Sequence, residues 1–399
     1  MSDSFLRRTW VEIDLDAIES NFREVKKKAS AAKVMAVVKA DAYGHGVEQV
    51  AQALADAGAD WFGVSNLEEA LQLRALGHTL PILILGYTPP NRARTLAQQN
   101  ISQALYCSEY ALELSAEAAA AGVRVKAHLK LDVGMCRIGF PAFGSQKQLH
   151  HALEACRLPG LIPEGVFTHF QSADFGGDPD GGITQKQFDN FRAAVEWLRE
   201  QGVCFSVRHC SNSAACITRP EMQLDLVRAG ISLYGLSPSA ECAGAVKEHP
   251  AMQCRTTITM VKDIPAGAAV GYGRTYTAPS PRRVATVCIG YADGYLRDFS
   301  NRACMLVRGQ RAPVIGNVCM DQAVLDVTGI EGVRAGDVAT VFGKDRESLL
   351  PVDELAVHAD TIHYELVCLI SRRVPRVYYR NHKIVHVTDY LGDCCHPFL

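Results

Sequence analysis

The sequence has no long apolar run, no excess of charge of one sign and no apolar leader segment. No stretch approaches the roughly 18 uninterrupted apolar residues of a membrane-spanning helix, and the N-terminal sequence MSDSFLRRTWVEIDLDAIESN lacks the apolar core of a signal peptide. The formal net charge of −2 argues against a surface for nucleic acid or a polybasic membrane patch. We therefore expect a cytoplasmic protein that binds neither a nucleic acid nor a membrane.

Paired-cysteine motifs are also missing, although the chain has 14 cysteines. A secreted disulfide scaffold would be shorter and denser in cysteine. Cys394 and Cys395, followed by His396, resemble a metal cluster, but adjacent cysteines are poor partners for one zinc ion and no second pair accompanies them. We predict no metal site and interpret the other cysteines as small buried apolar residues.

The first part of the chain alternates short apolar runs with longer helical patterns such as LDAIESNFREVKKKA and EEALQLRAL, which is typical of βα units. The expected strands cover residues 10–14, 34–38, 61–65, 81–85, 103–107, 125–132, 164–170, 204–210 and 224–230. Eight or so such units over about 250 residues indicate a parallel barrel better than an open sheet. No GxGxxG follows the first strand, so the sequence gives no support to a dinucleotide-binding fold.

The pattern changes after YGLSPS (234–239). From about Met252, apolar runs alternate with glycine, proline and charged turns, and one short helical pattern, PVDELAVHAD, interrupts them. The sequence therefore predicts a TIM-like, eight-stranded parallel α/β barrel over residues 10–240. A mainly antiparallel β-domain should follow over residues 241–399, together with residues 1–9.

Chemically capable side chains follow several of the expected barrel strands, where barrel enzymes carry their active sites. These residues are Lys39, Asp41 and Tyr43; Lys130, Asp132 and Arg137; Thr168 and His169; His209, Asn212 and Ser213; and Arg228. A strand-end lysine is usually a snorkelling surface residue, and a single strand-end histidine is usually structural. Alternatively, a desolvated lysine has a lowered pKa and can attack an aldehyde as a nucleophile.

Two segments have the features of a phosphate site. SNSAA (211–215) combines hydroxyl and amide groups with an expected helix start, and RAGISLYG (228–235) places a glycine shortly after a strand-end arginine. Taken alone, either segment is equally well explained as a helix N-cap or a loop glycine.

Together these segments resemble the alanine racemase family, whose members use pyridoxal 5'-phosphate (PLP) and combine a barrel with a C-terminal β-domain. The resemblance spans nearly the whole chain and ten motifs in the family's order. They are VVKADAYGHG (37–46), KLDVGMCRIGF (130–140), THF (168–170), SNSAA (211–215), VRAGISLYG (227–235), VGYGRTYTA (270–278), IGYADGYLR (289–297), CMDQ (319–322), TIHYE (361–365) and SRRVPR (371–376).

The resemblance implies a role for each matching residue. Lys39 would hold PLP covalently and act as one catalytic base, with Tyr272 as the second. The implied cofactor contacts are Lys39, Tyr43, Arg137, His169, Asn212, Ser213, Arg228, Gly230, Ile231 and Tyr364. The implied substrate contacts are Arg137, Met320 and Asp321, and the implied supporting residues are Lys130, His209, Asp174, Tyr291 and Arg297. Lys130 matches a lysine that carries a carbamate in many members.

Racemisation explains why these residue types are needed. A proton must leave one face of the α-carbon and return to the other, so two bases are required, while PLP provides the electron sink. A phenol is a poor base at neutral pH, so nearby positive charge from His169 and Arg228 should assist Tyr272. Arg228 can only donate to the pyridine nitrogen. It should leave that nitrogen unprotonated and favour racemisation over transamination.

The resemblance implies a homodimer with shared active sites and a role in supplying D-alanine for peptidoglycan. A broader racemase of the same fold, acting on serine, remains an alternative, because Asn317 stands where many members have an arginine at the substrate entrance. A non-catalytic PLP carrier would lack the second domain. A PLP decarboxylase fits the pair of motifs KADAYGHG and GYGRTY less well.

Overall fold

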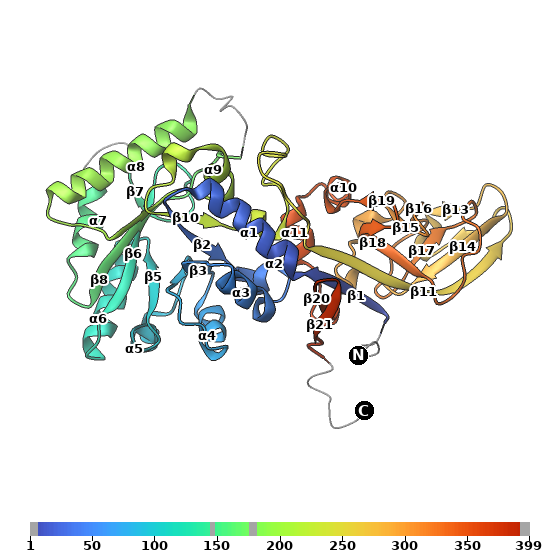
Figure 1. Cartoon of the computed structure of the whole chain (residues 1–399), viewed down its shortest axis with the longest axis horizontal. Coiled ribbons are helices and arrows are strands. Elements are labelled where there is room, and N and C mark those ends of the chain that lie inside the picture. Colours follow the sequence, from blue (N-terminus) through green and yellow to red (C-terminus); the bar gives the residue numbers. More distant parts are fainter. Residues whose placement is uncertain (1–6, 144–147, 175–181, 392–399) are drawn as a thin grey trace. The chain divides into compact units, whose positions relative to one another are not determined.

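The computed structural model describes residues 7–143, 148–174 and 182–391, which form two compact units (Figure 1). One unit comprises Ala17–Ala42 and Val47–His249. The other comprises Met1–Asp16, Tyr43–Gly46 and Pro250–Leu399, so far as these residues are described. Cys394, Cys395 and His396 lie outside the described residues.

The first unit is a nearly closed barrel of parallel strands. In order around the barrel these are β10 (Leu226–Ala229), β2 (Lys33–Val37), β3 (Trp61–Val64), β4 (Ile82–Ile84), β5 (Ile101–Leu105), β6 (Val125–Asp132), β8 (Leu161–Phe167) and β9 (Val207–His209). Two backbone hydrogen bonds connect β9 with β10, the two ends of this series of strands. Asp225 N–H donates to Arg208 O at 3.1 Å, and Arg228 N–H donates to Ser211 O at 3.0 Å. The predicted parallel barrel is therefore confirmed.

Helices follow the strands as the βα pattern predicts. They are α1 (Leu15–Ala29), α3 (Val47–Asp56), α4 (Leu67–Ala75), α5 (Ala93–Gln98), α6 (Ser108–Ala120), α7 (Leu149–Cys156), α8 (Ile183–Glu200) and α9 (Ser213–Thr218). The short element α2 (Lys39–Tyr43) is a left-handed turn. Helix α1 illustrates the cause: Ile18, Phe22, Val25 and Ala29 recur at helical spacing and are buried. Lysines in its last turn also suit the negative end of the helix dipole.

The side chains inside the barrel are arranged in layers, and these layers determine how far along the strands the site lies. Met35, Trp61, Leu83, Val207 and Leu226, from five different strands, form one apolar cluster. Because side chains alternate along a strand, the residues two positions further on point the same way. On β9 and β10 these are His209 and Arg228, so a polar layer lies above the apolar one, toward the carboxyl ends of the strands.

The second unit is mainly antiparallel. Its main sheet contains β16 (Gln310–Pro313), β15 (Cys304–Val307), β18 (Val338–Asp345), β11 (Met252–Ile264), β1 (Thr9–Asp14), β20 (Arg376–Arg380) and β21 (Lys383–Thr388), with β14 (Arg282–Val287), β17 (Ala323–Asp326) and β19 (Ser348–Leu350) at its margins. A separate hairpin joins β12 (Ala269–Val270) to β13 (Tyr276–Thr277). Two helices, α10 (Val352–His358) and α11 (His363–Cys368), accompany the strands.

Two details of the sequence-based organisation were wrong. Residues 10–14 were predicted to open the barrel, but β1 pairs with β11 and β20 of the β-domain. A strand followed by a helix has the pattern of a βα unit whichever sheet its edges join, so the pattern alone does not identify its partners. The single helix predicted in the β-domain is also accompanied by α11, whose six residues are too few to give a clear helical period.

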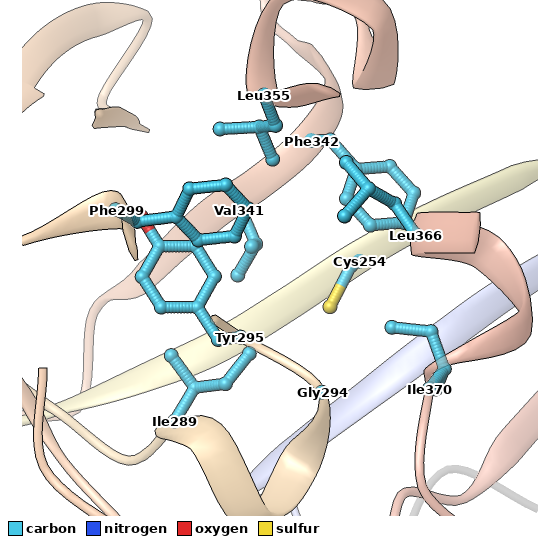
Figure 2. Close-up of a pocket in the computed structure, with 10 residues that line it drawn as sticks. All are labelled: Cys254, Ile289, Gly294, Tyr295, Phe299, Val341, Phe342, Leu355, Leu366 and Ile370. Carbon is cyan, nitrogen blue, oxygen red and sulfur yellow. The ribbon is translucent and has the colours of Figure 1, made fainter. Parts of the chain in front are cut away.

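The β-domain core contains a small cavity of about 10 Å³, lined among others by Cys254, Tyr295, Phe299 and Leu366 (Figure 2). This is close to the volume of one water molecule, and the lining is almost wholly apolar. We therefore interpret the cavity as a packing defect of the core.

Among the described residues, no helix combines the length and the apolar character needed to cross a membrane.

Candidate active site

The barrel part of the site is built around the Arg228 guanidinium, which lies at the carboxyl end of β10 and is buried. Its Nη1 donates to His209 Nδ1 at 3.1 Å. Its Nη2 donates to the carbonyl oxygens of Thr168 at 2.8 Å and Cys210 at 2.9 Å, and lies 3.3 Å from His169 Nδ1. Acceptors from the ends of two strands, β8 and β9, therefore fix this cation in one orientation.

Arg228 in turn determines the protonation of its neighbours. Burial lowers its own pKa to about 10, so the guanidinium remains charged at neutral pH. Burial and the charge of Arg228 hold the pKa values of His169 and His209 well below the usual range. Both imidazoles are neutral, and each presents its Nδ1 lone pair to the arginine.

Lys130 is a second buried basic residue at the same end of the barrel. It lies on β6, its side chain is buried, and its Nζ has no hydrogen-bond partner among the described residues. Its Nζ stands 5.0 Å from the centre of the Phe167 ring. Burial, together with the charges of Arg228 and Arg137, holds the pKa of Lys130 well below its usual range. The Lys130 amine therefore loses its proton more readily than the amine of an exposed lysine.

Lys39 follows β2 at the position predicted for a reactive lysine and is partly buried. The chain after it makes one left-handed turn: Ala40, Asp41, Ala42 and Tyr43 all have φ between 53° and 54°. L-residues with a Cβ rarely adopt this conformation, which costs about 1–2 kcal/mol each. The Asp41 side chain accepts from Val47 N–H at 2.8 Å and so closes the turn onto α3. Four strained residues beside one lysine are typical of a functional site.

The predicted helix start in SNSAA is confirmed at α9. Asn212 is the N-cap, and its side-chain oxygen accepts from Ala215 N–H at 3.0 Å. Ser213 Oγ accepts from Gly230 N–H at 2.8 Å, which joins the α9 start to the chain after β10. Ile231 follows in a buried 3-10 turn. The Ser213 hydroxyl can still donate its own hydrogen to an anion, whereas the Gly230 and Ala215 N–H groups are already bonded.

Tyr272 belongs to the β-domain and is 72% exposed in the chain. It follows Gly271, whose φ of 70° favours glycine. The Asn317 side chain donates to the Tyr272 carbonyl at 2.7 Å. The residue predicted to alter the substrate entrance therefore also fixes the backbone that carries the proposed second base.

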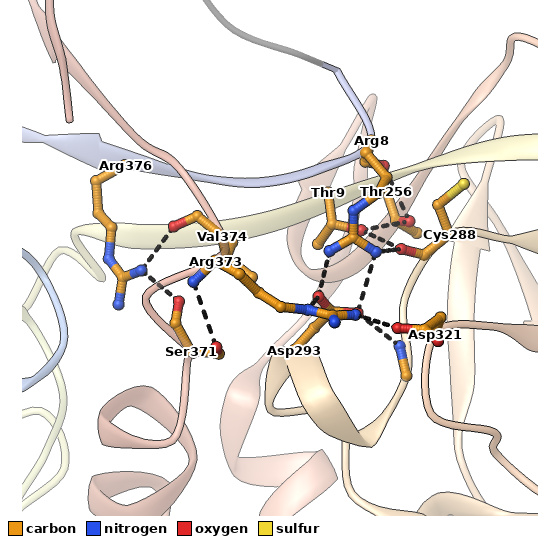
Figure 3. A network of polar contacts seen from close by, with 11 residues as sticks. Arg8, Thr9, Thr256, Cys288, Asp293, Asp321, Ser371, Arg373, Val374 and Arg376 are labelled. Carbon is orange, nitrogen blue, oxygen red and sulfur yellow. Dashed lines mark hydrogen bonds and ion pairs between the residues drawn. The ribbon is translucent and has the colours of Figure 1, made fainter. Parts of the chain in front are cut away.

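The segment with Met320 and Asp321 is held by an ion-pair network (Figure 3). Arg373 donates to Asp321 at 2.5 Å and to the fully buried Asp293 at 2.7 Å, and Arg8 pairs with the same Asp293. Burial alone would raise the pKa of Asp293, but the two arginines hold it below its usual value. The Asp293 carboxylate thus remains charged and anchors the segment.

Backbone contacts complete this anchor. The N–H groups of Tyr291 and Ala292 donate to the carbonyls of Cys319 at 3.0 Å and Met320 at 3.1 Å. A Cβ at Gly290 would lie only 2.2 Å from the Cys319 oxygen, so only glycine allows this approach. The motif IGYADG therefore acts as a clamp on residues 319–321, while the Met320 side chain remains 53% exposed.

The remaining predicted residues are placed as follows. Tyr43 and Tyr364 are neighbours, with ring centres 6.4 Å apart. Arg137, Tyr291 and Arg297 are exposed in the chain, and Asp174 accepts through its carbonyl from Ser239. The barrel residues Lys130, His169, His209 and Arg228 are brought together. Tyr272, Met320, Asp321, Tyr291, Arg297, Tyr43 and Tyr364 belong to the β-domain unit.

Two polar residues of the barrel were missed, the buried His128 and the partly buried Glu164. His128 contacts His209 at 2.9 Å, and Glu164 contacts His128 at 3.3 Å. The sequence did carry a signal, because VKAHLKLD places His128, Lys130 and Asp132 at period two in a strand that is buried on both faces.

Comparisons with known proteins agree with this geometry. The family described as "Alanine racemase, N-terminal domain" matches residues 13–238, and "Alanine racemase, C-terminal domain" matches residues 251–378. The alanine racemase of Desulfovibrio desulfuricans is 43% identical over 94% of this chain and 99% of its own length.

Solved structures give the same result. Alanine racemase from Bacillus anthracis with bound L-Ala-P has a TM-score of 0.91 and 37% identity, covering 98% of this chain and 99% of that one. Alanine racemase from Bartonella henselae with covalently bound pyridoxal phosphate has a TM-score of 0.82 and 26% identity, covering 93% and 99%. This chain belongs to the alanine racemase family, and it is an isomerase of that class.

Proposed function

We propose that the enzyme interconverts L-alanine and D-alanine with PLP held on Lys39, using Lys39 and Tyr272 as bases on opposite faces of the α-carbon. The observation that carries this proposal is the buried Arg228 guanidinium, held by His209, His169 and two carbonyls. A donor-only cation at this place suits a reaction in which the proton must return to the α-carbon.

The residues present fit PLP. Lys39 offers a primary amine at a strand end, the Ser213 hydroxyl, held by Gly230 N–H, offers a donor to a phosphate, and Arg228 offers N–H donors to the pyridine nitrogen. Tyr43, Arg137, His169, Asn212, Ile231 and Tyr364 are the other proposed contacts. When bound, PLP supplies the electron sink that makes the α-proton acidic.

The chain's own residues then perform the proton transfers. With PLP in place, Lys39 Nζ would accept or donate the α-proton on one face, and the Tyr272 hydroxyl would do so on the other. Neutral His169 leaves Arg228 as the fixed cation of this layer. Arg137, Met320 and Asp321 are proposed to bind the substrate. His209, Asp174, Tyr291 and Arg297 support these groups.

Lys130 is proposed to carry a carbamate. Its buried, neutral amine attacks carbon dioxide and releases one proton, which leaves a carboxylate on Nζ. That carboxylate would place a negative charge beside Lys130 Nζ, which has no hydrogen-bond partner among the described residues. It would also accept hydrogen bonds from Arg137. Supply of labelled carbon dioxide should give a carbamate carbon signal by NMR that is absent in Lys130→Ala.

We further propose a cytoplasmic homodimer in which Lys39 of one chain works with Tyr272 of its partner and which supplies D-alanine for peptidoglycan. Purified holoenzyme should be yellow, and borohydride reduction should trap the cofactor on Lys39. An adduct on Lys130, or none, would refute the assignment.

Mixed dimers test the shared site. Lys39→Ala and Tyr272→Phe homodimers should each lose nearly all activity. Refolded together, they form heterodimers with one doubly defective and one intact site, so activity should return. Heterodimers that stay inactive would show that each chain builds its own site.

A broader racemase that accepts serine is the second candidate, and Asn317 is the observation that favours it. Racemisation rates on a panel of amino acids decide between the two. Asn317→Arg should slow serine more than alanine, whereas an equal effect on both would remove Asn317 from the argument.

A further inference from the structure

A line of buried side chains runs from Arg228 through the barrel layer to a carboxylate near its edge. Arg228 Nη1 lies 3.1 Å from His209 Nδ1, His209 Nε2 lies 2.9 Å from His128 Nδ1, and His128 Nε2 lies 3.3 Å from Glu164 Oε2. These four residues come from β10, β9, β6 and β8. His209 and His128 are fully buried.

The two ends of this line fix the proton positions between them. A guanidinium can only donate and a carboxylate can only accept. His209 must therefore accept at Nδ1 and carry its proton on Nε2, from which it donates to His128. His128 must accept at Nδ1 and donate from Nε2 to Glu164. A proton on both nitrogens of either ring would place an N–H against another donor.

The electrostatics of the line agree with this assignment. Burial holds the pKa of both imidazoles below the usual range. Burial raises the pKa of Glu164, but hydrogen bonds from His128 and Ser102 outweigh it and bring the pKa to about 2. Glu164 is thus an ionised acceptor at neutral pH. Lys126 pairs with its other oxygen at 3.3 Å, outside the line.

The packing leaves the rings little freedom to turn. Phe167 stacks on His209, with ring centres 4.9 Å apart and planes 4° apart, and Trp61 meets the His128 ring edge-on at 5.4 Å. Gly165 lies opposite His128 on the neighbouring strand, and a Cβ there would lie 2.5 Å from the imidazole. The glycine at position 165 thus leaves just enough room for the His128 ring, and the ring cannot shift far from this position.

We propose that Glu164 and His128 are positioning residues that orient Arg228 toward the reacting group by fixing the tautomer of His209. This rests on the proposed function for Arg228. Glu164 is the final acceptor in this series of hydrogen bonds, so it determines which nitrogen of each histidine donates. Its acceptor oxygen therefore matters more than its charge. A glutamine oxygen can replace it, whereas a leucine side chain cannot.

The test compares Glu164→Leu with Glu164→Gln and with Lys126→Met, which removes the ion pair outside the line. Histidine ¹⁵N spectra of the folded protein report the tautomers without any cofactor. In the parent, Glu164→Gln and Lys126→Met, both rings should carry the proton on Nε2. In Glu164→Leu, nothing accepts from His128 Nε2, so a fraction of the protein should show Nδ1–H signals for His128 and His209, with Arg228 turned away from His209 in that fraction.

The functional readout is the number of racemisation turnovers per conversion of PLP to its amine form. This ratio counts only working sites, so a loss of folded enzyme does not change it. In Glu164→Leu it should fall by about tenfold, with kcat reduced by about 10–100-fold. Glu164→Gln should restore the ratio to within about threefold of the parent.

Unchanged tautomers in folded Glu164→Leu, or changed tautomers with an unchanged ratio, would each overturn the proposal. An equal fall of the ratio in Lys126→Met would also overturn it, because charge near the barrel edge would then explain the effect. A parent that shows the expected tautomers but does not racemise alanine would refute the proposed function instead.

Discussion

The two units hold their functional groups in different ways. In the barrel, side chains hold side chains: Arg228 is buried and bonded to His209 and His169. In the β-domain, contacts hold the backbone: Asn317 binds the carbonyl of Tyr272, while the Tyr272 side chain is 72% exposed. The barrel therefore fixes charges and protons, and the β-domain fixes the path of the chain and leaves the side chains accessible.

This difference predicts different consequences of substitution. A charge removed from the desolvated barrel layer changes the reaction, because electrostatic interactions are strong where water is excluded. A contact removed from the β-domain clamp loosens a segment, so it should change stability and substrate binding more than chemistry.

The largest effect is expected at the centre of the barrel layer. Arg228→Glu replaces a donor with an acceptor that holds a proton on the pyridine nitrogen, so racemisation should fall by about 10²–10³-fold. Transamination products should rise, while the cofactor stays bound. Rates of both reactions, measured on one sample, check this.

Arg228→Lys keeps the positive charge and serves as the control. It should racemise more slowly than the parent without gaining transamination. If Arg228→Glu formed no more transamination product than Arg228→Lys, the charge of this residue would not decide the fate of the proton.

The next effect concerns pH. His128, His169 and His209 stay neutral in the fold, because burial lowers their pKa values, but in the unfolded chain they bind protons below about pH 6.5. The barrel should therefore lose stability as pH falls through 6.5, by about 1.4 kcal/mol per histidine one unit lower. Glu164, with a pKa of about 2, stays ionised in this window.

Peptide-resolved hydrogen exchange measures this unit by unit. After correction for intrinsic exchange rates, protection of the barrel strands should fall between about pH 7.5 and about pH 5.5, by about 4 kcal/mol for the three rings together. His151→Gln, which alters an exposed histidine, should leave the pH dependence unchanged. Equal protection at both pH values would contradict buried, neutral imidazoles.

The sequence predicted the strands of the barrel well, but it did not predict which sheet the first strand of the chain joins. Periodic apolar runs located the strands from β2 to β10, and the polar residues after them located Lys39, His209 and Arg228. The same periodicity could not tell that β1 belongs to the β-domain, since sheet membership depends on which edge a strand meets, hundreds of residues away.

The hydrogen bonds of the site were equally beyond the sequence. Asn317 was singled out as a departure from the family, but its bond to the Tyr272 carbonyl depends on how two loops approach each other. The left-handed turn after Lys39 gave no signal, because ADAY contains no glycine that would indicate positive φ. Such conformations depend on surrounding contacts that outweigh local preference.

A smaller effect is expected from the β-domain clamp. Arg373→Met removes donors from Asp293 and Asp321, and leaves the buried Asp293 carboxylate with Arg8 as its ion-pair partner. Unfolding free energy should fall by about 2 kcal/mol, and KM for alanine should rise more than kcat falls. Denaturant unfolding and steady-state kinetics measure the two.

Arg283→Met is the matched control in the same domain. Its ion pair with Asp263 is exposed, so its loss should cost less than about 1 kcal/mol and leave KM unchanged. If Arg373→Met had the same KM as this control, the clamp would make no contribution to substrate binding.

The smallest effect is expected where the barrel itself is strained. Ala40 is exposed and left-handed, with φ of 53°, so Ala40→Gly should remove about 1–2 kcal/mol of backbone strain and add about 0.5–1 kcal/mol of unfolded-state entropy. The net result should be a gain of up to about 1 kcal/mol.

Ala116→Gly, at an exposed position inside the right-handed helix α6, should instead lose about 1 kcal/mol. Denaturant unfolding of both variants measures the difference. If Ala40→Gly were as destabilising as Ala116→Gly, the left-handed turn would be absent in solution. If it were stabilising but slowed racemisation, the rigidity of this turn would be what holds Lys39 in place for the proton transfer.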